Sequence, residues 1–232
     1  MYKRTIMALT ENNIIDAVYA LYETDDTGWG ATSSEYLSTR VFLNAGLNDW
    51  AMRQTWRDLW STLTAASDGT KTITAATYSY ACPTNFSMPN SWVRTISGTT
   101  NTFWQVIPTE MQAKHASDTS NFCYFTGSVA DGFTLNFNAR KTLVTGDTIN
   151  YEYYKTPTLY TATTTKSEIP DPYYLVYYAL ARMLKNDGED FSYEETKAQE
   201  IMDRMEVNNI QGYWDINNPV EESLSLGVGF GV

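Results

Sequence analysis

Apolar residues near the start of the chain recur at the spacing of an α-helix. Within residues 11–23 they are Ile14, Ile15, Val18 and Leu21, which fall on one face of a helix. This segment is predicted to be a short amphipathic helix, because such a stripe is buried against other elements while the opposite face stays in water. A polar, glycine-rich stretch follows and predicts a loop.

A longer helix is predicted from Ser33 to Leu63. Thr32 and Glu35 have the T-x-x-E spacing of a capping box, which satisfies free backbone amides at a helix start. The apolar residues of its two halves point in different directions, so the helix needs more than one neighbour. Those neighbours are other helices of this chain or another subunit. The candidate interface residues of the first half are Leu43, Leu47 and Trp50, and the stripe of the second half is Trp56, Leu59, Trp60 and Leu63.

From Ser67 the sequence changes to threonine, tyrosine and short runs of alternating apolar residues. Turn signals containing glycine, serine and aspartate separate these runs, which is typical of a β domain. The candidate strands lie at residues 71–81, 91–97, 102–108, 121–127, 132–139 and 147–156. The region is predicted to be an antiparallel β sandwich or partly closed barrel.

Two more helices are predicted in the last third of the chain. Asp171 is a good N-cap, and Pro172 suits the first helical position, where a missing N–H has no cost. Ser192 and Glu195 form a second capping box ahead of the last helix, which is expected to run to Asn208.

Together these elements predict an α+β fold, in which a four-helix layer is split by an inserted antiparallel β sandwich or barrel module. An extended C-terminal tail follows the last helix. The predicted parts are the N-terminal half of the helical domain at residues 1–66, the β module at 67–163, the C-terminal half of the helical domain at 164–208, and the tail at 209–232.

The predicted tail has the alternating pattern of an extended strand with one apolar face. Its candidate docking residues are Leu224, Leu226, Val228 and Phe230, which alternate with serine and glycine. A chain end is usually disordered unless something holds it, and these side chains would be costly to leave in water. The tail is therefore expected either to add to a partner subunit as a strand or to pack on its own domain.

Tyrosines and prolines gather where the chain passes from the β module back to the helices. Alternation places Tyr151 and Tyr153 on one face of the last strand. Pro157 then ends the strand ladder, because proline has no N–H to donate. These residues are predicted to form a joint between the two layers; the alternative is a ring platform for sugars or bases. The predicted joint residues are Tyr151, Tyr153, Pro157, Pro170, Pro172, Tyr173 and Tyr177.

Charged residues are sparse and lean acidic, with 27 Asp and Glu against 16 Lys and Arg and a net charge of −11. This balance argues against a protein that grips nucleic-acid phosphates, because phosphate binding needs clustered cations. The apolar runs are too short to span a bilayer or to form the core of a signal peptide, so no membrane partner is expected. The protein is expected to be made in the cytoplasm.

No catalytic, metal or cofactor-binding site is predicted. His115 is the one histidine of the sequence, whereas metal sites usually gather several His, Cys or carboxylate ligands. Cys82 and Cys123 lie in strand-like segments and are expected to be free, buried thiols, with a disulfide as the alternative. Neighbouring carboxylates at loops and helix starts are explained as solvated charges or as partners of helix dipoles. The chain is not expected to be an enzyme or to need a cofactor.

An ordered set of motifs resembles the head-to-tail adaptor proteins of tailed bacteriophages. The run YYKTPTL at residues 153–159 is similar to the Y-Y-x-x-P-x-L that closes the β module in that family. An I-P pair at residues 169–170 and an A-x-x-L segment at residues 181–184 follow, as in the family. Residues 80–86, YACPTNF, resemble the turn at the start of the inserted module, and residues 43–48, LNAGLN, resemble part of the longer N-terminal helix.

The resemblance implies a structural role without catalysis. Members of the family form a homo-oligomeric ring, commonly of twelve copies, beneath the portal protein at the DNA exit of the capsid. The helical layer meets the portal, the β module faces the downstream tail protein, and genome DNA passes through the channel without specific binding. The protein would then be a virion component of the neck between capsid and tail, made in the host cytoplasm. Its acidic residues would line the channel and keep DNA mobile.

In such a ring, part of the long helix is expected to touch a neighbouring copy, with Trp50, Trp56 and Trp60 in or near the helical core. The tail from Leu224 to Phe230 is expected to reach another subunit, with the portal favoured. Two other functions stay open. One is a sugar-binding, tail-associated receptor-binding module, which would need exposed rings on the β module. The other is a tail-tube or tail-completion ring protein.

Overall fold

The chain folds into two compact units and passes twice from one to the other. The structure is a computed structural model that describes residues 9–23, 28–63, 71–115 and 117–217. One unit is made of residues 1–57 and 159–232, and the other of residues Asp58–Thr158. The first holds the long helices and is called the helical unit; the second holds the strands and is called the β unit. The predicted α+β class is therefore confirmed.

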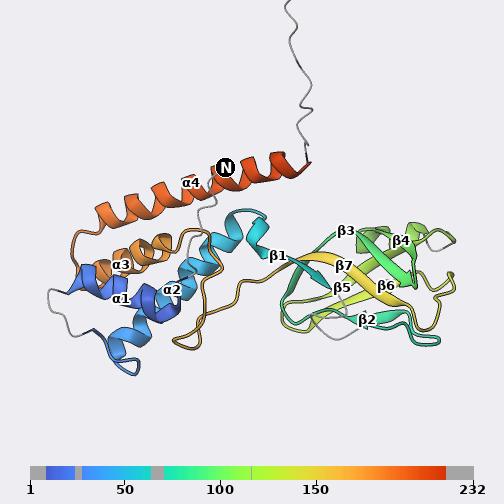
Figure 1. The fold of residues 1–232 in the computed structure, drawn as a ribbon, viewed down its shortest axis with the longest axis horizontal. Helices are drawn as coiled ribbons and strands as arrows, with labels where there is room; N and C mark the ends of the chain where they lie inside the picture. Colours follow the sequence, from blue (N-terminus) through green and yellow to red (C-terminus); the bar gives the residue numbers. More distant parts are fainter. Residues whose placement is uncertain (1–8, 24–27, 64–70, 116, 218–232) are drawn as a thin grey trace, which may run out of the picture. The chain divides into compact units, whose positions relative to one another are not determined.

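The described residues of the helical unit form four α-helices, and α3 is the central one. They are α1 (Glu11–Tyr22), α2 (Ser34–Arg53), α3 (Tyr173–Asp187) and α4 (Ser192–Asn217). Helix α3 packs against α1, α2 and α4, as Figure 1 shows. The stripe predicted for the first helix is largely correct, because Ile14, Ile15 and Val18 are buried in this core, whereas Leu21 is exposed.

Gly46 marks the closest approach of α2 to α3. A Cβ atom at this position would lie 2.9 Å from Cδ1 of Tyr178 and 3.1 Å from Cδ2 of Leu175. Both distances are shorter than ordinary carbon contacts. Glycine weakens the middle of a helix, but here its missing side chain allows the two helices to pack.

Helix α2 ends at Arg53, ten residues earlier than predicted, because Gln54 is fully extended. Trp56 folds back instead of continuing the helix: its ring stacks on Trp50 with centroids 5.0 Å apart. Its indole Nε1 donates to the Trp50 carbonyl at 2.6 Å. That carbonyl belongs to the last turn, where helix carbonyls have no partner within the helix. Trp56 thus caps the helix and buries a ring in the same step.

In the β unit, the residues that the structure describes form one curled sheet of seven strands in the order β1-β7-β3-β4-β5-β6-β2. The strands are β1 (Trp60–Leu63), β2 (Ser79–Ala81), β3 (Phe86–Ser97), β4 (Thr100–Val106), β5 (Phe122–Ser128), β6 (Gly132–Phe137) and β7 (Thr148–Lys155). Of the two predicted alternatives, this single curled sheet fits the partly closed barrel better than the sandwich of two sheets, and each of the six candidate strand regions overlaps a strand.

Two features of this sheet differ from the prediction. Residues Trp60–Leu63 form strand β1, paired antiparallel with β7, and not the last turns of a helix. The two apolar residues of this short segment, Trp60 and Leu63, do not by themselves decide between a helix and a strand. Pairing with β7 decides in favour of the strand. In addition, β4 and β5 pair in parallel. This pairing requires a crossover connection, and the short 3-10 helix Thr109–His115 lies in it.

One face of the sheet forms the core of the β unit. Phe86 lies at its centre, stacked on Phe125 at 5.0 Å and on Tyr153 at 5.5 Å between ring centroids. Tyr151 and Tyr153 share this buried face, as their alternation predicted.

Both predicted C-terminal helices are present, but their boundaries differ from the prediction, and Ser192 is the first residue of α4 and not its N-cap. The Asp171 carboxylate accepts a hydrogen bond from the Tyr173 N–H at 3.2 Å, and α3 starts one residue after Pro172. Helix α4 runs to Asn217 and not to Asn208. The first residues of the predicted tail are therefore helical, and residues 218–232 lie outside the described part of the chain.

Candidate functional site

Two asparagines hold the chain where it leaves and re-enters the helical unit. At the return, the Tyr160 N–H donates to Oδ1 of Asn44 at 2.8 Å, and Nδ2 of Asn44 donates to the Tyr160 carbonyl at 3.1 Å. At the exit, the Arg57 N–H donates to Oδ1 of Asn209 at 3.1 Å, and Nδ2 of Asn209 donates to the Thr55 carbonyl at 2.9 Å. A side-chain amide has both donors and an acceptor. Each asparagine therefore bonds one backbone N–H and one backbone carbonyl, as a neighbouring β-strand would.

The returning segment is also bound to the start of α1. The Glu11 N–H donates to the Thr165 carbonyl at 2.8 Å, and Thr10 and Lys166 form an isolated antiparallel bridge. The Glu11 side chain is fully buried and pairs with Nε of Arg40 at 2.5 Å. A buried carboxylate needs such a partner, so this ion pair fixes α1 against α2 beside the returning segment.

The residues of the predicted joint are divided between the two units. Tyr151 and Tyr153 are buried in the core of the β unit, and Pro157 is half-buried. In the helical unit Pro172 is buried, Pro170 and Tyr177 are half-buried, and Tyr173 is 54% exposed. The prediction did not include Asn44 and Asn209, because no periodicity identifies a polar side chain that binds backbone.

The candidate interface residues of α2 are covered by the chain's own helices. Leu43, Leu47 and Trp50 are buried in the helical unit and present no surface to a second copy in this structure. The exposed apolar residues of the same helix are Leu37 and Val41, one turn apart, and Met52 near its end. The candidate tail residues Leu224, Leu226, Val228 and Phe230 lie outside the described part of the chain.

Large apolar side chains stand on the outer face of the β unit. Tyr154 of β7 pairs in register with Trp60 of β1 and Met88 of β3, which places the three on one face. On the adjoining part of this face, Trp92 and Phe103 are 53% and 55% exposed. Their rings meet edge to face, with centroids 6.4 Å apart and an angle of 90°. The inner tyrosines are unavailable to a ligand, but these outer rings are accessible.

A hollow of about 850 Å³ opens beside this outer face. Its walls come from the middle of β3, from the end of β4 with the residues after it, and from β5. The lining residues are Met88, Pro89, Asn90, Trp92, Gln105, Val106, Ile107, Pro108, Thr109, Glu110, Phe125 and Tyr154. Glu110 is the only Asp, Glu, Lys or Arg among them, so the hollow suits an uncharged ligand.

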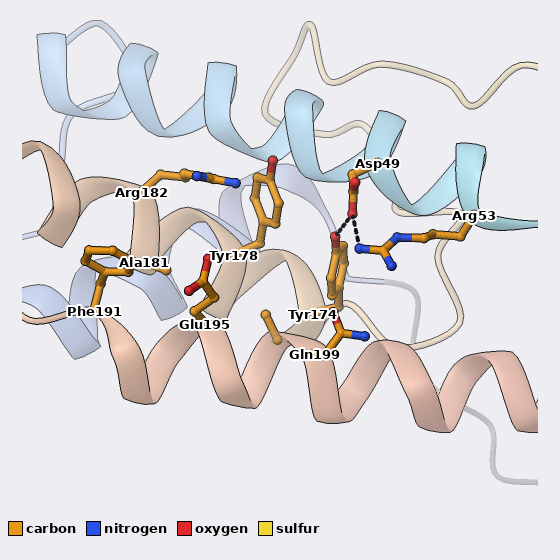
Figure 2. A pocket seen from close by; sticks show the side chains of 10 residues that line it. Asp49, Arg53, Tyr174, Tyr178, Ala181, Arg182, Phe191, Glu195 and Gln199 are labelled. Atoms are coloured by element: carbon orange, nitrogen blue, oxygen red, sulfur yellow. Dashed lines mark hydrogen bonds and ion pairs between the residues drawn. The ribbon is translucent and has the colours of Figure 1, made fainter.

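A smaller cavity of about 120 Å³ lies among α2, α3 and α4 (Figure 2). The Tyr174 hydroxyl donates to Oδ2 of Asp49 at 2.8 Å, and Nη2 of Arg53 lies 3.5 Å from the same oxygen. Burial, followed by the bond to Asp49, raises the pKa of Tyr174. The Arg182 guanidinium covers the Tyr178 ring at 5.0 Å. The cavity has space for a few waters or one side chain and holds a polar network that fastens α2 to α3.

The histidine and the two cysteines considered in the sequence as candidates for metal binding or a disulfide all lie in the β unit. Among the described residues, no three His, Cys, Asp or Glu side chains gather as a metal site. His115 pairs with Asp118 at 3.2 Å, and hydrogen bonds from Ser120, then His115, lower the pKa of Asp118 to about 2. Cys82 and Cys123 are free, and burial raises the pKa of both thiols.

The negative charge of the chain is concentrated in one unit. The helical unit carries 20 Asp and Glu against 10 Lys and Arg, whereas Asp58–Thr158 carries seven against six. The β unit is therefore nearly neutral, and the helical unit accounts for almost all of the net charge of −11. The part of the chain that the structure describes contains no helix of the length and apolarity needed to span a membrane.

Comparison with known proteins supports the resemblance drawn from the motifs. A family model described as SU10 adaptor protein matches residues 13–220, which include the inserted β unit and most of the helical unit. The resemblance to phage head-to-tail adaptors is thereby confirmed. No curated protein matches the chain.

Proposed function

The chain belongs to the SU10 adaptor protein family, and from that membership we propose that it forms an oligomeric ring connecting the capsid portal to the tail. A phage adaptor is a structural component of the virion. In the proposal the ring has twelve copies, with the portal on one side and a downstream tail protein on the other. The genome leaves through its lumen, and the protein catalyses no reaction.

The observation that carries the proposal is the extent of the family match. It spans residues 13–220, so it includes the insertion of the β unit into the helical unit and not one motif alone. The hydrogen bonds of Asn44 and Asn209 are consistent with a structural role, because they fix both crossings of the chain to the helical unit.

The charge distribution supports a lumen lined by the helical unit. Glu195, Glu200 and Asp203 are exposed on α4, and the unit as a whole carries twice as many acidic as basic residues. An acidic wall repels the DNA backbone weakly and leaves it free to move. A ring structure whose lumen carries a net positive charge would contradict this part of the proposal.

The direct test is to mix the purified protein with the portal protein and to count copies per ring in electron-microscope images. Twelve copies bound on one face of the portal are expected. An unrelated acidic protein of similar mass is the control for adhesion to the portal. Absence of binding at micromolar concentrations of both proteins would contradict the proposal.

A second candidate function is sugar binding by the β unit, and the exposed rings of Trp60, Trp92 and Phe103 favour it. Aromatic faces pack against the apolar faces of sugar rings, and Trp92 would report the contact. Host polysaccharide should then quench tryptophan fluorescence, and a Trp92→Ser variant should lose most of that response. An unchanged spectrum at saturating polysaccharide would exclude this function.

A further inference from the structure

The β unit has a second concave site, where the 3-10 helix Thr109–His115 meets the residues that follow β6. A pocket of about 440 Å³ opens there, within the range of about 300–1,000 Å³ that is common for ligand sites. Its lining includes the buried rings of Phe122 and Phe137 and the exposed side chains of Ala113 and Ala139. It is called the basic pocket here because of the charges around it.

Three of the six Lys and Arg residues of the β unit lie at this pocket or next to it in sequence. Arg140 lines the pocket, Lys141 follows it, and Lys114 stands between two lining residues. None of the three cations forms an ion pair or a side-chain hydrogen bond with a described residue. His115 contacts Asp118 through Nδ1, which leaves its Nε2 for another partner. Unpaired cations around a concave surface favour an anionic ligand.

Neutral donors beside Arg140 favour a carboxylate. Nε2 of Gln112 donates to the Tyr124 hydroxyl at 2.7 Å, so the hydrogen of that hydroxyl is available to a further acceptor. A guanidinium fork with such donors matches the oxygens of a carboxylate. Nucleic acid fits less well, because Phe122 and Phe137 are only 5% and 2% exposed and offer no face on which a base could stack. The pocket therefore suits an acidic segment of a protein.

The helical unit has a surface of the opposite charge. It is the acidic turn, residues 187–194, which joins α3 to α4 and contains four acidic residues and no basic one (Figure 1). Glu189 and Asp190 are exposed and Glu194 is half-buried. Glu189 and Glu194 form no ion pair with a described residue. The Tyr193 side chain, 61% exposed, lies among these carboxylates in sequence.

Hydrogen bonds within the acidic turn hold it in one shape. Gly188 ends α3 in the left-handed conformation, with a φ of 78°. Oδ1 of Asp190 accepts from the N–H of Ser192 at 3.0 Å and from its hydroxyl at 2.7 Å. These two bonds, the backbone bond first, lower the pKa of Asp190 and keep its charge at neutral pH. A segment that is already ordered loses less conformational entropy when it binds.

We propose that the acidic turn of one copy docks in the basic pocket of the next copy around the ring. The carboxylates of Glu189 and Glu194 pair with Arg140 and the lysines beside it, and the Tyr193 ring packs against the apolar lining. The contact joins two different surfaces, and such a head-to-tail contact can close a ring, whereas a surface that pairs with itself gives a dimer. The inference rests on the proposed ring and identifies the surfaces that join its copies.

Carbodiimide crosslinking of portal-bound rings tests the proposal, because the reagent joins a carboxylate to a lysine amine only where they touch. The full chain is prepared in isotopically light and heavy forms, which are mixed before they bind the portal. Linked peptides should contain Glu189 or Glu194 on one side and Lys114 or Lys141 on the other, and some should join a light chain to a heavy one. Links confined to chains of one label would place the contact within one molecule and overturn the proposal.

The same crosslinking of the concentrated protein without the portal separates this inference from the proposed function. Links between light and heavy chains there support the contact even where no ring forms on the portal. Complete rings without these links would refute this inference alone.

Exchange of the charges gives a second test. Arg140→Glu with Lys141→Glu should lower the number of complete rings on portals about tenfold, because like charges then face each other. Glu189→Lys with Glu194→Lys should have the same effect for the same reason. All four substitutions in one chain should restore the rings, because the two surfaces are again opposite in sign. A fourfold variant that is folded by circular dichroism but forms no rings would overturn the proposal.

The matched control changes the same charge elsewhere on the helical unit. Asp16→Lys with Glu35→Lys, at exposed positions of α1 and α2 outside the acidic turn, should leave the number of rings unchanged. An equal loss of rings in this control would show that net charge and not the contact controls assembly. Complete rings from the variant with Arg140→Glu and Lys141→Glu, together with lost binding of duplex DNA, would assign the pocket to nucleic acid and overturn the proposal.

Discussion

Asn44 replaces two backbone hydrogen bonds with one side chain. It pairs with both the N–H and the carbonyl of Tyr160, a residue that is 1% exposed. Buried backbone groups need partners, and an irregular returning segment cannot supply them by itself. One side chain of α2 therefore determines where the chain rejoins the helical unit. Hydrophobic periodicity, which located the helices, contains no signal for such a residue.

Replacing Asn44 should destabilise the helical unit. Asn44→Ala leaves the buried N–H and carbonyl of Tyr160 without partners, which costs about 2 kcal/mol in the free energy of unfolding. Urea denaturation followed by circular dichroism measures the change. Asn48→Ala, at an exposed position one turn away, is the control and should change stability by less than about 0.5 kcal/mol. Equal free energies of unfolding for Asn44→Ala and Asn48→Ala would contradict this role of Asn44.

Burial of Tyr160 also predicts a loss of stability at high pH. Burial raises its pKa to about 12, from an ordinary value near 10 in the unfolded chain. The contribution of the buried, neutral Tyr160 to the free energy of unfolding is complete below pH 10. It is lost as the pH rises toward 12, because Tyr160 ionises in the unfolded chain before it ionises in the folded one. Tyr160→Phe should reduce the stability lost between pH 10 and 12 by about 2 kcal/mol. Urea titrations at fixed pH measure this slope. Tyr173→Phe, which removes an exposed hydroxyl, should leave it unchanged.

At the scale of elements, local pattern located most segments, whereas tertiary pairing determined their ends. The spacing of Trp56, Leu59, Trp60 and Leu63 fits a helix, yet Trp60–Leu63 pair with β7 and form strand β1. The parallel pairing of β4 with β5 was likewise beyond prediction, because turn signals identify hairpins and not crossovers. The hollow arises from that pairing, so no sequence pattern indicated it.

The packing of α2 on α3 depends on the small size of Gly46. Gly46→Val should lower the free energy of unfolding by about 2 kcal/mol, because its side chain overlaps Leu175 and Tyr178. Gly46→Ala should cost less, since alanine also favours the helix by about 1 kcal/mol. Thermal and urea denaturation give the ranking. Gly30→Ala, where a Cβ meets nothing within 4 Å, is the control, and a stabilising Gly46→Val would contradict the close approach.

At the scale of the whole molecule, the two units differ most in charge. The family and the α+β class were readable from ordered motifs, but the segregation of charge appears only once the unit boundaries are known. A unit with twice as many acidic as basic residues repels itself at low ionic strength. The nearly neutral β unit has no comparable repulsion.

Salt should therefore stabilise one unit selectively. Raising the ionic strength from about 0.01 M to 1 M shortens the screening length from about 30 Å to about 3 Å. Hydrogen exchange in α1 to α4 should slow with added sodium chloride, while exchange in β5 and β6 should stay nearly constant. The β unit is an internal control, because both are observed in the same molecule. Equal salt responses would show that net charge does not limit the stability of the helical unit.

The pairing of Trp60 with Tyr154 has a consequence for how the chain folds during synthesis. It brings the two ends of the β unit together, so a β unit that has already folded acts as a short tether between α2 and α3. About a hundred residues of loop are then removed from the closure of the helical unit, which spares roughly 1–2 kcal/mol of chain entropy. Helix α3, which touches all three other helices, leaves the ribosome only after that tether can exist. The insertion would thus favour an order of folding in which the β unit is complete before α3 packs against the other helices.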